Sequence, residues 1–322
     1  MFNPSRATPA SALDQGMREH LAGSLERIGV MAGAVLNDVD LAPVLAHIRA
    51  HRIDPGVFAR YYDLVFALQS ADYDAARTLW LQIASLAASA AELELVGFGP
   101  KALGEDAERF TRLLSIGAAR PPIFLEPPAD DWPIFVQMWS AAMALLEALD
   151  SAWADEILQL TVRVIAAVPG SAEGAVSFSG GSSMMTWGAL IVNAAQARHR
   201  IGMLVIATHE TTHQVLFGVS REEPLLTNPV EERYATELRP VMRPMNAVFH
   251  STYVSGRTAL LCRSLMTQCA AELSPAELQE LQHLLDLQLA RFDQGYEVID
   301  RHARLTPLGR RLIDEARSGL SA

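Results

Sequence analysis

The stretch RIGMLVIATHETTHQVLF, residues 200–217, decides how we expect this chain to fold. An apolar run, residues 201–206, leads into the H-E-x-x-H sequence formed by His209, Glu210 and His213. On a helix, residues four apart share one face with Cβ atoms about 5–6 Å apart, so both histidines can direct a nitrogen at one divalent metal ion. Glu210 projects from the neighbouring side of the turn, where it can reach a metal-bound water or hydrogen-bond a ligand. The stretch therefore predicts a buried amphipathic helix that carries a metal site.

The composition is that of a soluble protein. Half of the 322 residues are apolar, and no apolar run reaches the roughly 18 residues of a membrane span. The N-terminus, MFNPSRATP, lacks the apolar segment of a secretory signal. Cys262 and Cys269 are seven positions apart on one expected helix, too far for a disulfide, which fits a reduced compartment. The net charge of −11, without a block of like charges, argues against nucleic acid. We expect a cytoplasmic protein with neither membrane nor nucleic acid as partner.

The first third of the chain has a helical pattern throughout. From about Leu13 to Ser115, apolar residues recur at spacings of three and four, with breaks at turn-forming residues. Asp54 before Pro55 predicts an N-cap followed by proline at the first helical position, and Asp72 opens the next helix. We expect this part to be a scaffold, with one wall facing a substrate.

A proline-rich segment, residues 121–128 (PPIFLEPP), predicts a boundary. It separates an N-terminal helical region, residues 1–120, from a metal-binding region, residues 121–322. In the second region two β-like pieces, residues 174–178 and 187–193, lie on either side of a Gly/Ser-rich turn. We expect them to form a small β-sheet or hairpin beside the metal-binding helices.

Three more helices are expected after the metal helix. The pattern predicts them at about residues 245–271, at about residues 275–296, and after Pro307. The last two begin with a capping residue followed by proline. The expected fold is therefore mainly α, a multi-helix protein with a small β element.

Two residues compete to be the third metal ligand, and they imply different chemistry. Glu232 lies 19 positions after His213, a spacing that resembles the gluzincin zinc metallopeptidases, in which Glu210 would be the general base. The alternative is His250, which would complete a three-histidine site. The first choice predicts amide hydrolysis at zinc, and the second suits a redox metal.

Arginines near His250 suggest an anionic co-substrate. Arg243, His250 and Arg257 follow one another at seven-residue spacing, which on one helix would bring all three to one face, and Arg239 lies close before them. α-Ketoglutarate chelates iron through its keto acid end, while its far carboxylate suits a bidentate arginine. This cluster predicts an anion clamp beside the metal.

Several short motifs follow one another along residues 173–263. They are Trp187-Gly188-Ala189, the H-E-x-x-H motif, Glu232-Arg233-Tyr234, Leu238-Arg239-Pro240, Arg243-Pro244 and His250-Ser251-Thr252-Tyr253-Val254. The set resembles the HExxH-motif peptide-modification proteins, a bacterial family of iron- and α-ketoglutarate-dependent peptide β-hydroxylases tied to natural-product pathways. The family tends to show glycine close before the third histidine, where this chain has Ala247.

The resemblance implies a set of functional residues and a reaction. His209, His213 and His250 would bind Fe(II). Arg243, or otherwise Arg257 or Arg239, would hold α-ketoglutarate with Tyr253 nearby, and Glu210 would orient a ligand or a water. With O2, the enzyme would hydroxylate an unactivated carbon, the β-carbon of an amino acid or of a peptide that is free or bound to a carrier or leader. The zinc peptidase built on Glu232 stays open as the alternative.

Overall fold

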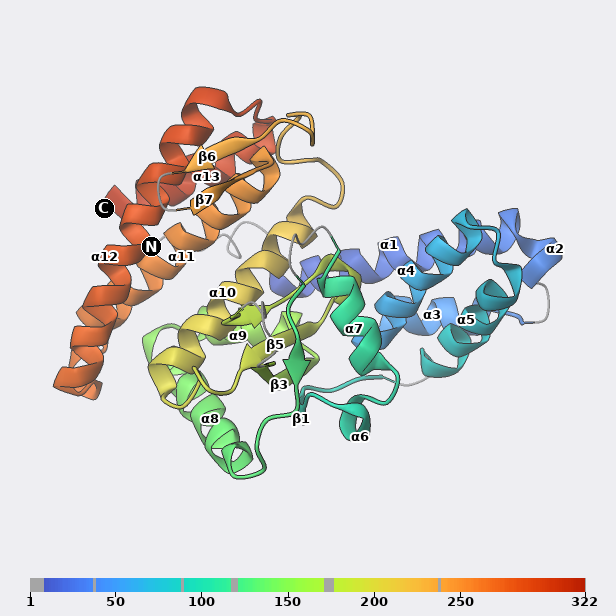
Figure 1. Cartoon of the computed structure of the whole chain (residues 1–322), viewed down its shortest axis with the longest axis horizontal. Coiled ribbons are helices and arrows are strands. Elements are labelled where there is room, and N and C mark those ends of the chain that lie inside the picture. The colour runs from blue at the N-terminus through green and yellow to red at the C-terminus, as the bar shows by residue number, and fades with distance from the viewer. Residues whose placement is uncertain are drawn as a thin grey trace.

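The computed structural model describes residues 9–36, 39–87, 90–116, 121–170, 177–236 and 239–321. Helices dominate this part of the chain, and a small sheet lies among them, which confirms the mainly α fold (Figure 1). The helices are α1 (Ala10–Met31), α2 (Gly33–Leu36), α3 (Ala42–Ala50), α4 (Pro55–Gln69), α5 (Tyr73–Leu86), α6 (Pro100–Leu103), α7 (Asp106–Leu114), α8 (Asp131–Leu149), α9 (Ser151–Leu160), α10 (Arg200–Val219), α11 (Met245–Gln268), α12 (Pro275–His302) and α13 (Pro307–Ser321). The strands are β1 (Glu94–Gly97), β2 (Phe124–Leu125), β3 (Arg163–Pro169), β4 (Gly180–Gly181), β5 (Ala189–Asn193), β6 (Tyr234–Thr236) and β7 (Arg239–Arg243).

The helix starts follow the capping signals in the sequence. The Asp54 side chain accepts a hydrogen bond of 2.7 Å from the Gly56 amide, and Pro55 occupies the first turn of α4. Asp72 caps α5 through the Ala75 amide at 3.1 Å. At the start of α12, Ser274 and Glu277 form a reciprocal capping box. These contacts satisfy amide groups that have no partner inside the helix.

The central sheet has the strand order β1-β3-β5-β4, with β2 paired to the far end of β3. β3 runs parallel to β1 and β5, whereas β4 is antiparallel to β5. Side chains of β3 alternate between two cores: Val164 packs toward α8, α9 and α10, and Ile165 packs toward α7. The sheet is therefore covered on both faces.

The sheet corrects part of the sequence interpretation. β1 lies inside the segment that was expected to be helical throughout, and β3 was not predicted as a strand. The expected strand at residues 187–193 is confirmed as β5, but its antiparallel neighbour β4 lies in the segment that was expected to be a turn. Residues 171–176, which cover most of the other expected strand, lie outside the described residues. β1 and β3 also join the two expected regions in one sheet.

The C-terminal helices form a separate layer, which Figure 1 shows at the opposite end of the molecule from α2–α5. α11 packs along α12 and α13 through a core that includes Phe249, Phe292 and Ile313. The β6–β7 hairpin lies against α12. α10 contacts the sheet on one side and α11 on the other, so it connects this layer to the rest of the fold.

Among the helices of the described residues, one is long and apolar enough to cross a membrane, judged by length and composition alone. This helix is α8. Its side chains Phe135, Trp139 and Leu146 are buried against the central core. A core helix of a soluble protein passes the same test, and this packing is consistent with a soluble protein.

Candidate metal centre

α10 presents its two histidines to a cavity because its other side is anchored in the core. Met203, Leu204 and Ala207 are fully buried. The side chain of Gln214 also donates a 3.1 Å hydrogen bond to the carbonyl of Ala189 in β5. The motif residues His209 and His213 thus lie on the side that faces α11, with their ring centroids 5.2 Å apart.

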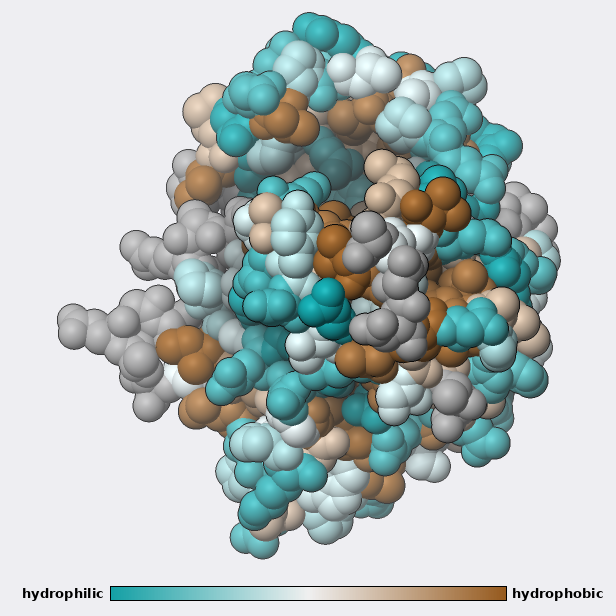
Figure 2. Space-filling model, turned by 90° about the vertical axis from the view of Figure 1, so that its right-hand side faces the viewer, coloured by the Kyte–Doolittle hydropathy of each residue, from teal (hydrophilic) through white to brown (hydrophobic). Residues whose placement is uncertain are grey.

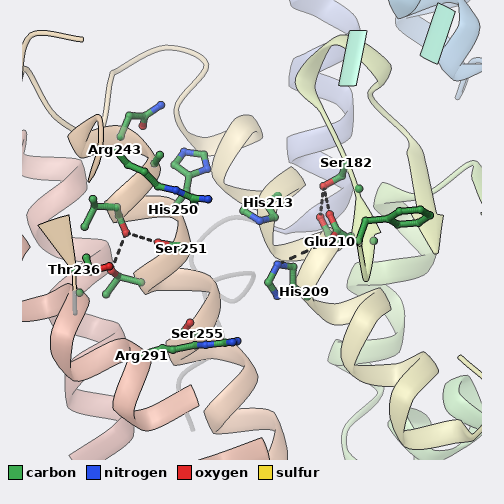
Figure 3. A pocket seen from close by; sticks show the side chains of 18 of the residues that line it. Ser182, His209, Glu210, His213, Thr236, Arg243, His250, Ser251, Ser255 and Arg291 are labelled. Atoms are coloured by element: carbon green, nitrogen blue, oxygen red, sulfur yellow. Dashed lines mark hydrogen bonds and ion pairs between the residues drawn. The ribbon is translucent and has the colours of Figure 1, made fainter. Parts of the chain in front are cut away.

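α11 contributes the third histidine from across the cavity (Figure 3). The His250 ring stacks on His213 with centroids 5.8 Å apart and an interplanar angle of 20°. Phe217, one turn beyond His213, lies 5.4 Å from the same ring. His209, His213 and His250 therefore line the same cavity, two from α10 and one from α11.

The imidazoles of His213 and His250 are buried, and burial favours their neutral form. Burial lowers the pKa of His213 to about 4. Burial, with a smaller contribution from His213, lowers the pKa of His250 to about 3. A histidine must be neutral to bind a metal, so both rings have the required protonation state at neutral pH.

Glu210 lies behind the histidines, between α10 and the edge strand β4. The Ser182 hydroxyl donates a 2.8 Å hydrogen bond to Glu210 Oε2, and Glu210 Oε1 is 4.0 Å from Nε2 of His209. Burial raises the pKa of Glu210 to about 7, against the opposing effect of the Ser182 hydrogen bond. Gly180 permits this close packing, because a Cβ atom there would lie 2.8 Å from Cγ of Glu210.

The cavity has a volume of about 650 Å³. Its apolar lining comprises Leu114, Pro122, Phe124 and Phe178 on the sheet side, where Ser182 and Glu210 also line it, and Val241, Pro244, Ala247, Val248 and Leu287 on the α11 and α12 side. Its polar lining on the α11 and α12 side comprises Thr236, Arg243, Asn246, Ser251, Thr252, Ser255, Arg291 and Gln294. Among the described lining residues, Glu210 is the one carboxyl group and Arg243 and Arg291 are the two guanidinium groups.

Arg243 lines the cavity, although not for the reason that the sequence suggested. It belongs to β7, and α11 begins only at Met245, so helical spacing does not relate Arg243 to His250. The hairpin instead brings Arg243 over the start of α11, and Figure 3 shows its guanidinium beside His250. Arg239 also lies in β7, but its side chain is outside the described part of the structure.

Arg257 and Tyr253 do not line the cavity, so the structure does not bring them to the place where a co-substrate was expected. Arg257 is fully buried and pairs with Glu156 of α9 at 2.8 Å, and its guanidinium lies 4.9 Å from the centroid of the Trp153 ring. Tyr253 is fully buried beside Phe249. At this level of α11 the cavity is lined by Ser255, which is two residues and about 200° around the helix from Arg257.

Glu232, the competing third ligand, also lies outside the cavity lining. Its carboxylate accepts hydrogen bonds from Tyr234, from Asn228 and, at 3.2 Å, from Arg304. The bond from Tyr234, more than the others, keeps the pKa of Glu232 below its usual value. These partners hold the carboxylate away from His209 and His213.

Arg291 is a charged lining residue that sequence reasoning missed. It comes from the exposed side of α12, a regular amphipathic helix, and it reaches the cavity only because α12 packs along α11. Figure 3 shows its guanidinium beside Ser255, extending across the cavity. No local signal in the sequence connects Arg291 with the H-E-x-x-H motif.

The donor set fits a divalent transition metal, since three neutral imidazoles are ligands for zinc and iron alike. In the described residues no three His, Cys, Asp or Glu side chains are yet arranged to enclose a metal ion. Because the His213 and His250 rings are stacked, coordination requires the imidazoles to turn toward a common point.

No protein-family model matches the chain, and no curated protein matches it.

Proposed function

We propose that the protein is a non-haem iron oxygenase that uses α-ketoglutarate and O2 to hydroxylate an amino-acid or peptide substrate. The observation that carries the proposal is the meeting of three imidazoles, from α10 and α11, in one cavity that Arg243 also lines. Iron with α-ketoglutarate and O2 would supply the oxidising power needed to attack an unactivated carbon, such as a β-carbon. The order of motifs that resembles the HExxH-type hydroxylases supports the same conclusion.

The residues of this chain have distinct parts in the proposal. His209, His213 and His250 hold the metal, and Arg243 binds the far carboxylate of α-ketoglutarate. Ser182 holds Glu210 in place, and Glu210 in turn restrains His209. The cavity of about 650 Å³ has room for the co-substrate and for one residue of a substrate.

The cellular setting follows from the same proposal. Cys262 and Cys269 are both free and buried, which suits the cytoplasm, where Fe(II) and α-ketoglutarate are available. The resemblance points to a role in natural-product biosynthesis, with the substrate peptide free or attached to a carrier or leader.

The test is anaerobic addition of Fe(II) and then α-ketoglutarate, with the visible metal-to-ligand charge-transfer band as readout. We expect the band in the native protein and its loss in His250→Ala, because the variant lacks one of the three ligands. Glu232→Ala is the matched control and should keep the band. A protein that forms no band, but holds one zinc ion that is lost in Glu232→Ala, would instead be a zinc peptidase.

A further inference from the structure

The cavity lining contains a second guanidinium group, that of Arg291, in addition to that of Arg243. One guanidinium is enough for the far carboxylate of α-ketoglutarate, and Arg243 beside His250 is placed for it (Figure 3). Arg291 enters the same cavity from α12 and is more exposed than Arg243. The two arginines therefore reach the cavity from different elements, Arg243 from β7 and Arg291 from α12.

The charge around Arg291 also favours an anionic ligand. The chain as a whole has a net charge of −11, yet the described cavity lining holds two arginines and one carboxyl group. That carboxyl belongs to Glu210, which accepts a hydrogen bond from Ser182 on the far wall. Two guanidinium groups in one lining favour an anionic ligand over a neutral one.

Neutral groups next to Arg291 complete a polar end to the cavity. Ser255 and Gln294 line the wall beside it, and their hydroxyl and amide groups can donate hydrogen bonds to a carboxylate. Phe124 and Phe178, whose rings lie edge to face with centroids 4.8 Å apart, line the cavity on the sheet side together with Ser182 and Glu210. The cavity thus offers a guanidinium group with neutral hydrogen-bond donors on its α12 side and an aromatic surface on its sheet side.

We infer that the substrate carries a carboxylate that binds Arg291 and an apolar group that packs on Phe124 and Phe178. That this ligand is a substrate rests on the proposed function. The binding site for the ligand is inferred from the cavity alone. The carboxylate can belong to a free amino acid, to the last residue of a peptide or to an acidic side chain. All three present the same group to a guanidinium.

Calorimetric titration of the protein without added metal tests the inference with defined probes. The first is N-acetyl-Ala-Leu with a free C-terminal carboxylate, the second is its C-terminal amide, and the third is N-acetyl-Asp-Leu amide. We expect the free acid to bind about 10-fold more tightly than the amide, a preference that weakens with salt. Affinity for the third probe tells a side-chain carboxylate from a terminal one.

Variants assign the preference to one side chain. Arg291→Met should remove the difference between acid and amide, and Arg291→Lys should keep part of it. Arg310→Met is the matched control, because it removes a charge from α13, outside the cavity lining. It should bind the free acid as the native protein does.

The inference is overturned if acid and amide bind equally, if neither binds, or if the preference survives in Arg291→Met. It is also overturned if Arg291→Met loses the charge-transfer band with α-ketoglutarate, since Arg291 would then anchor the co-substrate. Failure of the proposed function looks different. The native protein would form no band, whereas the carboxylate preference in the absence of metal would remain.

Discussion

The two sides of α11 place their polar and charged side chains in different surroundings. On the cavity side, His250, Ser251 and Ser255 line open space. On the core side, Tyr253 and Arg257 are sealed, and the Arg257 guanidinium is matched by the Glu156 carboxylate at 2.8 Å. The comparison shows that an arginine near a metal motif is available to a ligand only if its own side of the helix is open. Sequence distance from the motif does not decide this.

The sealed pair is not an ideal one. Arg257 is fully buried, and none of its three nitrogens makes a hydrogen bond of good geometry in the structure. Oε2 of Glu156 is unpaired in the same sense. A buried ion pair of this kind adds little net stability, but removal of one partner leaves a bare charge in the core.

Arg257→Met should have the largest effect on stability. It leaves the carboxylate of Glu156 buried without a counter-charge, so we expect the free energy of unfolding to fall by about 3–5 kcal/mol. Urea denaturation of the metal-free protein measures this loss. The double variant Arg257→Met/Glu156→Leu should recover most of it, because no charge then remains. A single variant as stable as the native protein would contradict a sealed core side.

Arg243→Met should weaken co-substrate binding and leave the stability of the fold almost unchanged, the reverse of what is expected for Arg257→Met. Because Arg243 lines the cavity, the change should weaken α-ketoglutarate binding about 10- to 100-fold, as expected for loss of a charge-assisted hydrogen bond. The free energy of unfolding should change by less than about 1 kcal/mol. The charge-transfer titration and urea denaturation measure the two quantities. A large loss of stability with unchanged co-substrate affinity would show that Arg243 behaves like Arg257.

Gly295→Ala tests the line where α12 meets α11. A Cβ atom at this position would lie 1.9 Å from Oγ1 of Thr252, which itself lines the cavity. Thr252 is held by a 2.8 Å hydrogen bond to the Val248 carbonyl, so the helices must separate, at a cost of about 1–3 kcal/mol. Thermal denaturation measures the cost. The double variant Gly295→Ala/Thr252→Ala should recover this loss of stability, because the Thr252 hydroxyl is then absent. If it does not, the contact with Thr252 is not the cause of the loss.

The helices and their caps were predictable because the signals are local. Asp54, Asp72 and Ser274 are capping residues whose partners lie within three positions. β3 was missed because it is buried on both faces, and such a strand has an uninterrupted apolar sequence that resembles a buried helix.

The candidate site was predictable only in part, for a related reason. His209 and His213 follow from one helix, whereas the sequence offered both Glu232 and His250 as the third ligand, and the resemblance to a family favoured His250. Arg291 depends on how α12 packs along α11, and no sequence pattern near the motif reports that packing. Arg257, an alternative to Arg243 in the sequence analysis, does not reach the cavity, because helical spacing from His250 does not determine which neighbour each turn meets.

Glu277→Gln measures the stability contribution of a more exposed ion pair, for comparison with the buried pair of Arg257 and Glu156. Glu277 pairs with Arg200 at 2.6 Å and caps α12, and the Arg200 hydrogen bond, more than other contacts, lowers the pKa of Glu277 to about 2. Its stabilising contribution is complete above the unfolded pKa of about 4.5 and is lost as the pH falls toward 2. We expect a loss of about 1 kcal/mol at pH 7, which narrows between pH 5 and pH 3. A difference independent of pH would exclude the charged pair as its cause.

Glu232→Ala should have the smallest effect. Glu232 is partly exposed, binds Tyr234 and Arg304 at the surface, and does not line the cavity. The variant should keep its metal content and shift the melting temperature by less than about 2 °C. Glu231→Ala, an exposed neighbour with the same change in charge, is the control. Loss of the metal in Glu232→Ala alone would mean that the hairpin carries this carboxylate into the site. The zinc peptidase would then replace the oxygenase, and the two sides of α11 would no longer divide ligand-binding from structural charge.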